Sequence, residues 1–170
     1  FDVDFLRSAL DQIGSDNVQG EVYLTDTIAL AAQSGRGAQA FVLDDIWQAE
    51  GCNDRDQLSD LRAELLKRVC KAHQVEGVSI LDPTATSIDV DVALGRDAVI
   101  EPFTSLVGTT EVGPGATIGS GSVIIDSRIG AGAVVRDSYV EDSVVDSGVV
   151  LNPQTVLRSK PTSSSEGNAG

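Results

Sequence analysis

Few side chains in this chain are of types that carry out chemistry on their own. It has one histidine, His73, and two cysteines, Cys52 and Cys70, whose separation does not match a metal site. We interpret the cysteines as reduced thiols. His73 falls near the end of a predicted helix, where a protonated imidazole would be favoured. We expect no acid–base catalysis from it, because no suitable nucleophile or acid partner lies near it.

Phosphate-binding features are also scarce. Gly35-Arg36-Gly37 is the nearest candidate for a glycine-rich loop, but it follows a predicted helix, whereas such a loop follows a strand and opens a helix. The formal charge of −14 argues against a general affinity for nucleic acid or anionic membranes. Any phosphate must therefore meet a local set of donors or a metal ion. The apolar runs are too short to span a bilayer, so we expect no membrane insertion.

The elements that position such groups are clearest in the second half of the chain, where an aliphatic residue returns about every six residues. The series is Ile88, Leu94, Ile100, Leu106, Val112, Ile118, Ile124, Ile129, Val135, Val140, Val145, Leu151 and Leu157. A hexapeptide period predicts a parallel β-helix, in which each unit supplies a short strand and a tight turn. Three units per coil give about four coils. The few five-residue steps shorten a corner and keep the aliphatic residue pointing inward.

Polar residues fill the predicted corners. Gly, Pro, Asp and Ser follow the aliphatic positions, and they are the residues that tight turns favour. We interpret the acidic members as solvated turn residues: Asp126, Asp137, Asp142 and Asp146.

The first half of the chain predicts an α/β segment followed by a long helix. We expect a helix over residues 1–14, a short helix that contains residues 28–32 with Thr25 or Asp26 as its N-cap, and a strand over 38–43. An apolar stripe from Leu58 to Ala72 predicts a helix that ends near Gly77.

These patterns divide the chain into four predicted parts. Residues 1–55 form the α/β segment, 56–76 a linker helix, 77–158 the β-helix and 159–170 a polar tail that we expect to be disordered. The chain contains no methionine and begins with Phe1, so we expect it to be a piece of a longer protein.

Three sequence blocks, together with the repeat, resemble one family. They are residues 19–26, residues 50–58 and residues 77–83, in the order and spacing of the bacterial bifunctional N-acetylglucosamine-1-phosphate uridyltransferase and glucosamine-1-phosphate acetyltransferase. The resemblance extends to about Arg158. It implies the end of a uridyltransferase domain, a linker helix and the first coils of a left-handed β-helix.

The resemblance also implies an activity. Members of this family acetylate glucosamine 1-phosphate with acetyl-CoA, then transfer a uridylyl group from UTP to the resulting N-acetylglucosamine 1-phosphate and release pyrophosphate. The product, UDP-N-acetylglucosamine, supplies peptidoglycan and lipopolysaccharide synthesis. Mg²⁺ is the implied cofactor, since a hard cation that bridges phosphate oxygens stabilises the leaving pyrophosphate. We expect the chain alone to lack activity.

Asn53 matches the family asparagine that contacts both Mg²⁺ and the nucleotide sugar, and its amide oxygen is a suitable neutral ligand. The alternative interpretation is that Asn53 caps the following helix, and both roles can coexist. Tyr23 and Thr25 match positions that line the sugar-phosphate pocket, and Glu21 matches a neighbouring pocket residue. Alternatively, Thr25 caps a helix and Tyr23 packs at a strand edge.

Arg158 matches an arginine that in relatives binds the substrate phosphate of the acetylation site, where its planar fork suits a phosphate. In the family a proline and a glycine follow this arginine, whereas here Ser159-Lys160-Pro161 follow. The remaining acetylation-site residues lie beyond this chain. The resemblance therefore implies a phosphate role for Arg158 without its usual partners.

Two alternatives to the enzyme fragment remain. The chain is a β-helix that serves to assemble trimers, since β-helix enzymes of this kind form homotrimers through flat coil faces. Otherwise it belongs to another sugar-1-phosphate nucleotidyltransferase with a hexapeptide tail, although residues 50–55 argue against this. We expect a cytoplasmic homotrimer.

Overall fold

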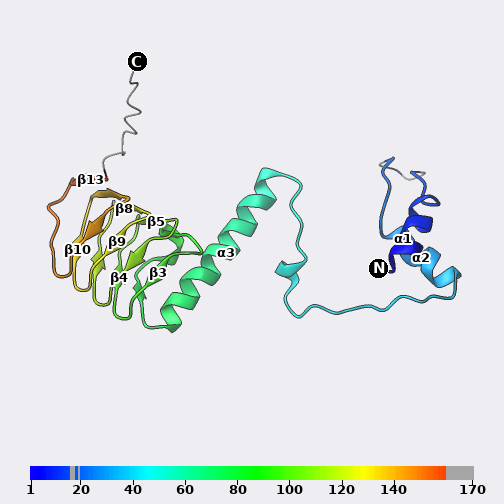
Figure 1. The fold of residues 1–170 in the computed structure, drawn as a ribbon, viewed down its shortest axis with the longest axis horizontal. Helices are drawn as coiled ribbons and strands as arrows, with labels where there is room; N and C mark the ends of the chain where they lie inside the picture. Colours follow the sequence, from blue (N-terminus) through cyan, green and yellow to red (C-terminus); the bar gives the residue numbers. More distant parts are fainter. Residues whose placement is uncertain (16–17, 19, 160–170) are drawn as a thin grey trace, which may run out of the picture. The chain divides into compact units, whose positions relative to one another are not determined.

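The computed structural model describes all residues except 16, 17, 19 and 160–170. Most of the predicted disordered tail and part of the predicted turn at Ser15–Asn17 therefore lie outside the described residues. The chain divides into two compact units, Phe1–Glu50 and Gly51–Gly170 (Figure 1). No helix among the described residues is both long enough and apolar enough to cross a membrane.

The first unit contains two short α-helices and a 3₁₀ helix: α1 (Val3–Leu10), α2 (Asp26–Gln33) and η1 (Ile46–Gln48). The Asp2 carboxylate caps α1 by accepting a hydrogen bond from the Phe5 amide at 2.8 Å. Gly35, with φ of 73°, ends α2 in the left-handed conformation. Helix α1 ends at Leu10, four residues before the predicted boundary at Gly14.

The strand predicted over residues 38–43 is wrong, because these residues form irregular coil. Phe41 and Val42 are 86% and 82% exposed. A strand needs a neighbour that satisfies its backbone groups, and no other described segment of this unit forms a strand. The buried residues of the first unit are few among those described: Ala9, Thr27 and Ala31.

The second unit begins with the predicted linker helix, α3 (Arg55–Val75). The Asp54 carboxylate accepts from the Gln57 amide at 2.8 Å, and the Gln57 side chain accepts from the Asn53 amide at 2.8 Å. This reciprocal pair is close to a capping box. It explains why the helix begins at Arg55.

A parallel β-helix follows α3, as the hexapeptide period predicts. A short 3₁₀ helix, η2 (Pro83–Ala85), lies between its first two strands. The strands are β1 (Ser79–Ile80), β2 (Ser87–Ile88), β3 (Ala93–Leu94), β4 (Val99–Ile100), β5 (Ser105–Val107), β6 (Glu111–Val112), β7 (Thr117–Ile118), β8 (Val123–Ile125), β9 (Arg128–Ile129), β10 (Val134–Val135), β11 (Tyr139–Glu141), β12 (Val144–Val145) and β13 (Val156–Arg158).

The strands form three parallel sheets, with orders β1-β4-β7-β10, β2-β5-β8-β11-β13 and β3-β6-β9-β12. Each turn of the chain contributes one strand to each sheet, which gives four complete coils and part of a fifth. A single bridge between Val134 and Val150 continues the first sheet into that fifth coil. The β-helix is left-handed, as the family resemblance implied.

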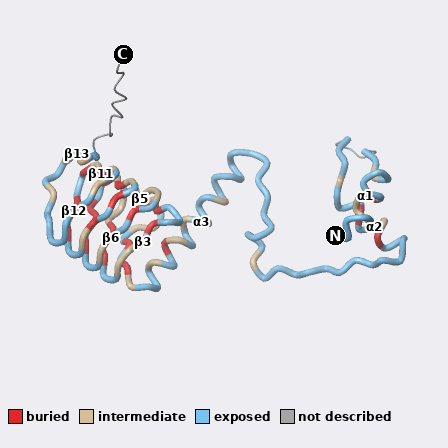
Figure 2. Tube along the Cα trace, viewed as in Figure 1, coloured by how far each residue is buried: buried red, intermediate tan, exposed pale blue. Residues whose placement is uncertain are grey.

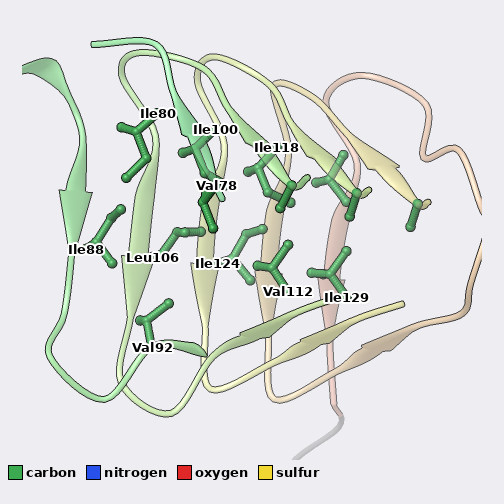
Figure 3. Packing of buried hydrophobic residues seen from close by; sticks show 14 of the residues in the cluster. Val78, Ile80, Ile88, Val92, Ile100, Leu106, Val112, Ile118, Ile124 and Ile129 are labelled. Carbon is green, nitrogen blue, oxygen red and sulfur yellow. The ribbon is translucent and has the colours of Figure 1, made fainter. Parts of the chain in front are cut away.

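Aliphatic side chains stacked in register fill the interior (Figure 3), and Figure 2 shows the buried positions along the coils. In one sheet Ile88 pairs with Leu106, which pairs with Ile124, and Val140 and Leu157 extend the same row. Ile100, Leu106, Ile118 and Ile124 are fully buried. Each such side chain contributes about 1.5–3 kcal/mol through removal from water. The predicted inward series is thus confirmed.

The shortened corners share one local structure. Asp126, Asp137 and Asp142 each adopt a positive φ of 43–45° at a five-residue step, a conformation that Asp tolerates better than most side chains. The serine after each aspartate donates to the carbonyl two residues earlier; for example, Ser127 donates to Ile125 at 2.6 Å. The three aspartates are exposed, as predicted for turn residues.

Helix α3 covers the first coil of the β-helix. Cys70 is 1% exposed, and Leu66 and Val69 pack against the same hydrophobic cluster. Burial raises the pKa of the Cys70 thiol, which agrees with a reduced, unreactive side chain.

The turn between β1 and β2 is held by Asp82. Thr84 donates two hydrogen bonds to the Asp82 carboxylate, and these hold the pKa of that carboxyl below its usual range.

Glycines line one corner because successive coils approach closely there. A Cβ on Gly95 would lie 2.5 Å from the Pro114 nitrogen, and one on Gly113 would lie 2.6 Å from the Ala131 nitrogen. Real Cβ atoms do not approach backbone atoms so closely. In the fourth coil the corresponding position, which follows Val145, is Asp146.

We expect Gly113→Ala to lower the free energy of unfolding by about 1–3 kcal/mol, because the backbone of the next coil must move to admit the methyl group. Asp146→Ala is the matched control at the same position of the last complete coil, and its effect should stay within about 0.5 kcal/mol. Urea unfolding of the two variants makes the comparison. Equal stabilities would show that the coils do not pack closely at this corner.

Candidate functional site

Three of the predicted site residues lie just before α2 in the first unit. Glu21 and Thr25 are exposed and Tyr23 is half-buried. Thr25 occupies the cap position of α2, but its side chain makes no capping hydrogen bond. The backbone there is held by the Tyr23 carbonyl, which accepts from the Asp26 amide at 3.0 Å. The alternative capping role predicted for the Thr25 hydroxyl is therefore not confirmed.

A hollow of about 580 Å³ lies nearby in the first unit, but Tyr23 and Thr25 do not line it. Its lining includes Phe5, Thr27 and Arg36. The Thr27 hydroxyl is already engaged, since it donates to the Leu24 carbonyl at 2.6 Å. The hollow also contains Gln39 and Arg36, and the Arg36 guanidinium lies 3.4 Å from an Asp2 carboxylate oxygen in the same lining.

Asn53 is exposed at the start of the second unit, two residues before α3. The alternative prediction that its side chain caps the helix is wrong, because Asp54 occupies the cap position and supplies the capping oxygen. The backbone amide of Asn53 is bonded to Gln57, so the loop is ordered by α3. The Asn53 side chain has no hydrogen-bond partner within the described part of the chain and is free to meet a ligand.

The described residues fit only one position of a magnesium site. Mg²⁺ prefers oxygen ligands and commonly takes one or two carboxylates with several waters. Asn53 provides one amide oxygen, whereas the described residues contain no group of three or more acidic, histidine or cysteine side chains that could hold a metal. A complete site would need at least one further protein ligand.

Arg158 lies in β13, at the opposite end of the second unit from Asn53 (Figure 1). Its Nε lies 3.1 Å from the Glu141 Oε2, and its Cζ lies 4.5 Å from the centre of the Tyr139 ring. The side chain is 58% exposed. Arg158 therefore remains open to an anion while two neighbours in β11 hold it.

The structure thus groups the predicted residues by element. Glu21, Tyr23 and Thr25 lie together before α2, whereas Asn53 and Arg158 lie apart within the second unit. Two functional candidates were missed, Tyr139 and Glu141. The repeat contained the signal for them: Leu157 and Val140 are three steps apart in the aliphatic series, so residues beside them become neighbours in adjacent coils.

The suggested interaction of a protonated His73 with the end of α3 is not supported. Its side chain is half-buried, and burial lowers its pKa below the usual value. The neutral imidazole is therefore the favoured form near pH 7. Its backbone carbonyl, which accepts from Val78 at 3.1 Å, closes the helix instead.

Comparison with known proteins gives matches over the full chain. It is 45% identical over 170 residues to the "Bifunctional protein GlmU" of Mycolicibacterium gilvum, covering 100% of this chain and 34% of the relative. It is 41% identical over 170 residues to the protein of the same name from Mycobacterium tuberculosis, again covering 34% of the relative. The chain is homologous to one part of the GlmU proteins.

This confirms the resemblance found in the sequence. The chain spans about a third of the length of the GlmU relatives that it matches. The match to the M. gilvum GlmU includes both units, because it extends over all 170 residues. No protein-family model matches the chain.

Solved structures add little to the GlmU matches. A serine acetyltransferase from Entamoeba histolytica in complex with cysteine covers 61% of this chain and 42% of its own, with 16% identity and a TM-score of 0.34. A perosamine N-acetyltransferase mutant from Caulobacter crescentus, in complex with CoA and GDP-perosamine, covers 58% and 60%, with 12% identity and a TM-score of 0.24. At these scores neither likeness supports a conclusion.

The capping geometry predicts different roles for two adjacent residues. Asp54→Ala should lower the free energy of unfolding by about 1 kcal/mol, because α3 loses its capping oxygen. Asn53→Ala should change it by less than about 0.5 kcal/mol, since no described contact of its side chain is lost. Urea unfolding followed by far-ultraviolet circular dichroism measures both. A larger loss for Asn53→Ala would restore its capping role.

Proposed function

We propose that this chain is part of an enzyme that makes UDP-N-acetylglucosamine. In this proposal one domain acetylates glucosamine 1-phosphate with acetyl-CoA, and the other joins the product to UTP with release of pyrophosphate. The observation that carries the proposal is the match of the whole chain, at 41–45% identity, to proteins named bifunctional GlmU. We also propose that the end-product serves peptidoglycan and lipopolysaccharide synthesis and that the enzyme acts in the cytoplasm.

The first unit and the loop before α3 belong, in this proposal, to the uridylyl-transfer site. The free amide of Asn53 supports a role as a ligand of Mg²⁺ and of the nucleotide sugar. The exposed Thr25 hydroxyl, which makes no capping bond, supports a contact to the sugar phosphate. Tyr23 and Glu21 lie within four residues of Thr25 and would line the same pocket. Mg²⁺, when bound, neutralises phosphate charge and stabilises the leaving pyrophosphate.

The β-helix belongs, in this proposal, to the acetylation domain. Arg158 would bind the phosphate of glucosamine 1-phosphate, because its guanidinium is exposed in the last strand and suits a phosphate through its planar fork. Acetyl-CoA would bind elsewhere in the full acetyltransferase. The chain by itself would then complete neither reaction.

We also propose that the β-helix assembles as a homotrimer. The β-helix exposes large apolar side chains outside the five-stranded sheet, among them Val90, Phe103 and Val144, which are 62%, 74% and 65% exposed. An apolar surface of this kind gains free energy when a second copy covers it. Sedimentation equilibrium should show a trimer at micromolar concentration. A strict monomer there would contradict the proposal.

The two sites predict opposite effects in a protein that contains this chain and the rest of a GlmU sequence. Asn53→Ala should reduce UTP-dependent pyrophosphate release by about tenfold or more, by analogy with other losses at metal sites, and leave acetylation unchanged. Arg158→Ala should weaken acetylation and leave pyrophosphate release unchanged. Assays of both reactions on both variants make the test.

The 170-residue chain alone serves as the control and should give no measurable pyrophosphate release. Turnover by this chain would refute its assignment as an incomplete part. An unaffected rate in the Asn53→Ala variant would exclude the ligand role of that residue.

A further inference from the structure

The register of β11 and β13 places three polar side chains on one outer surface. These strands pair in parallel, with Tyr139 opposite Val156 and Glu141 opposite Arg158. Successive side chains of a strand point to opposite faces. Because Val140 is fully buried and Leu157 packs against the core, Tyr139, Glu141 and Arg158 point outward.

Two neighbours hold the Arg158 guanidinium on two different sides. Its Nε lies 3.1 Å from Glu141 Oε2, and the Tyr139 hydroxyl donates to the same oxygen at 3.1 Å. The Tyr139 ring lies against the cation, with Cζ 4.5 Å from its centre. Glu141 is thus fixed by Tyr139, and Arg158 is fixed by both.

This arrangement leaves one edge of Arg158 unused. A guanidinium has five N–H donors in a rigid fork, and the contact with Glu141 engages the one on Nε. The two terminal nitrogens have no partner within the described part of the chain. They form the edge that binds two oxygens of a phosphate at once.

Other arginines on the β-helix surface lack this second contact. Arg128 pairs with Glu111 at 3.2 Å, and their side chains are 71% and 57% exposed. Arg136 lies 3.7 Å from Glu101. Among the described residues of the β-helix, only Arg158 lies over an aromatic ring. An exposed ion pair contributes little to stability, so the contact with the Tyr139 ring is the feature that distinguishes Arg158 from these arginines.

We propose that Tyr139 and Glu141 are positioning residues, which hold Arg158 so that its terminal nitrogens face the phosphate of the substrate. This inference rests on the proposed phosphate role of Arg158. Glu141 also places a negative charge beside the Arg158 cation. Holding Arg158 in place favours anion binding, whereas this negative charge opposes it. Phosphate affinity therefore depends on the acceptor atom at position 141 and on its charge, and the two contributions can be separated.

Two substitutions at one position separate these contributions. Glu141→Gln removes the charge but keeps an oxygen that can accept from both Arg158 and Tyr139, whereas Glu141→Ala removes the charge and the acceptor. At equal charge, the Gln variant should bind inorganic phosphate and glucosamine 1-phosphate about two- to tenfold more tightly than the Ala variant, because less side-chain freedom is lost on binding. Tyr139→Leu should reduce phosphate affinity relative to the unsubstituted chain.

The measurement is nuclear magnetic resonance of the arginine Nε–Hε groups in the ¹⁵N-labelled 170-residue chain. The Arg158 signal should be ordered in the unsubstituted chain and in Glu141→Gln, and averaged by motion in Glu141→Ala. Phosphate should shift the Arg158 signal, and glucosamine, which lacks the phosphate, should not. Glu111→Ala is the matched control, because it frees Arg128 and should leave the Arg158 response unchanged.

Three results would overturn the inference. They are equal phosphate affinity in the Gln and Ala variants, an Arg158 signal of equal mobility in both, and phosphate shifts at Arg128 as large as those at Arg158. The proposed enzymatic function is tested separately by pyrophosphate release and by acetylation in the longer protein. A failure of one would therefore not be mistaken for a failure of the other.

Discussion

The second unit depends on one constraint: each coil must place an aliphatic side chain directly over that of the coil before. The rows of Ile, Leu and Val are fully buried in the middle coils, and their removal from water is the main stabilising contribution. Parallel strands of two or three residues are too short to be stable alone. They persist because every strand pairs with its equivalent in adjacent coils and covers the same apolar interior.

Register in the interior also determines what meets on the surface. Since Leu157 stacks on Val140, Arg158 must lie beside Glu141. The ion pair between Glu111 and Arg128 arises in the same way from the row that joins Val112 to Ile129. A β-helix therefore brings together residues that are nearly one coil apart in sequence. Removing one residue from a corner would shift these pairs out of register unless the corner changes its conformation to compensate. Here the Asp-Ser corners, which occur at the five-residue steps, keep the strands in register.

Much of this fold could be predicted because its signals are periodic or local. The aliphatic series predicts the strands of the β-helix, and the linker helix predicted over residues 56–76 agrees with α3 within one residue at each end. The segment over residues 38–43 was mispredicted because a strand depends on a neighbour, and apolar composition alone does not supply one. Asn53 was given a capping alternative because Asn and Asp are both good caps, and only the geometry shows that Asp54 has that role.

Site contacts were less predictable than the elements that carry them. The exposed Thr25 hydroxyl and the ring beneath Arg158 depend on side-chain directions, which sequence spacing does not specify. The lowered pKa of His73 likewise depends on how deeply the end of α3 packs against the first coil.

Asp146 has a further consequence for the way the β-helix can grow. Where glycine occupies this corner, the next coil packs directly against its backbone, as Ala131 packs against Gly113. A layer laid at the same height over Asp146 would collide with its β-carbon. A coil after the fourth must therefore lie farther from the Asp146 backbone at this corner than Ala131 lies from the Gly113 backbone.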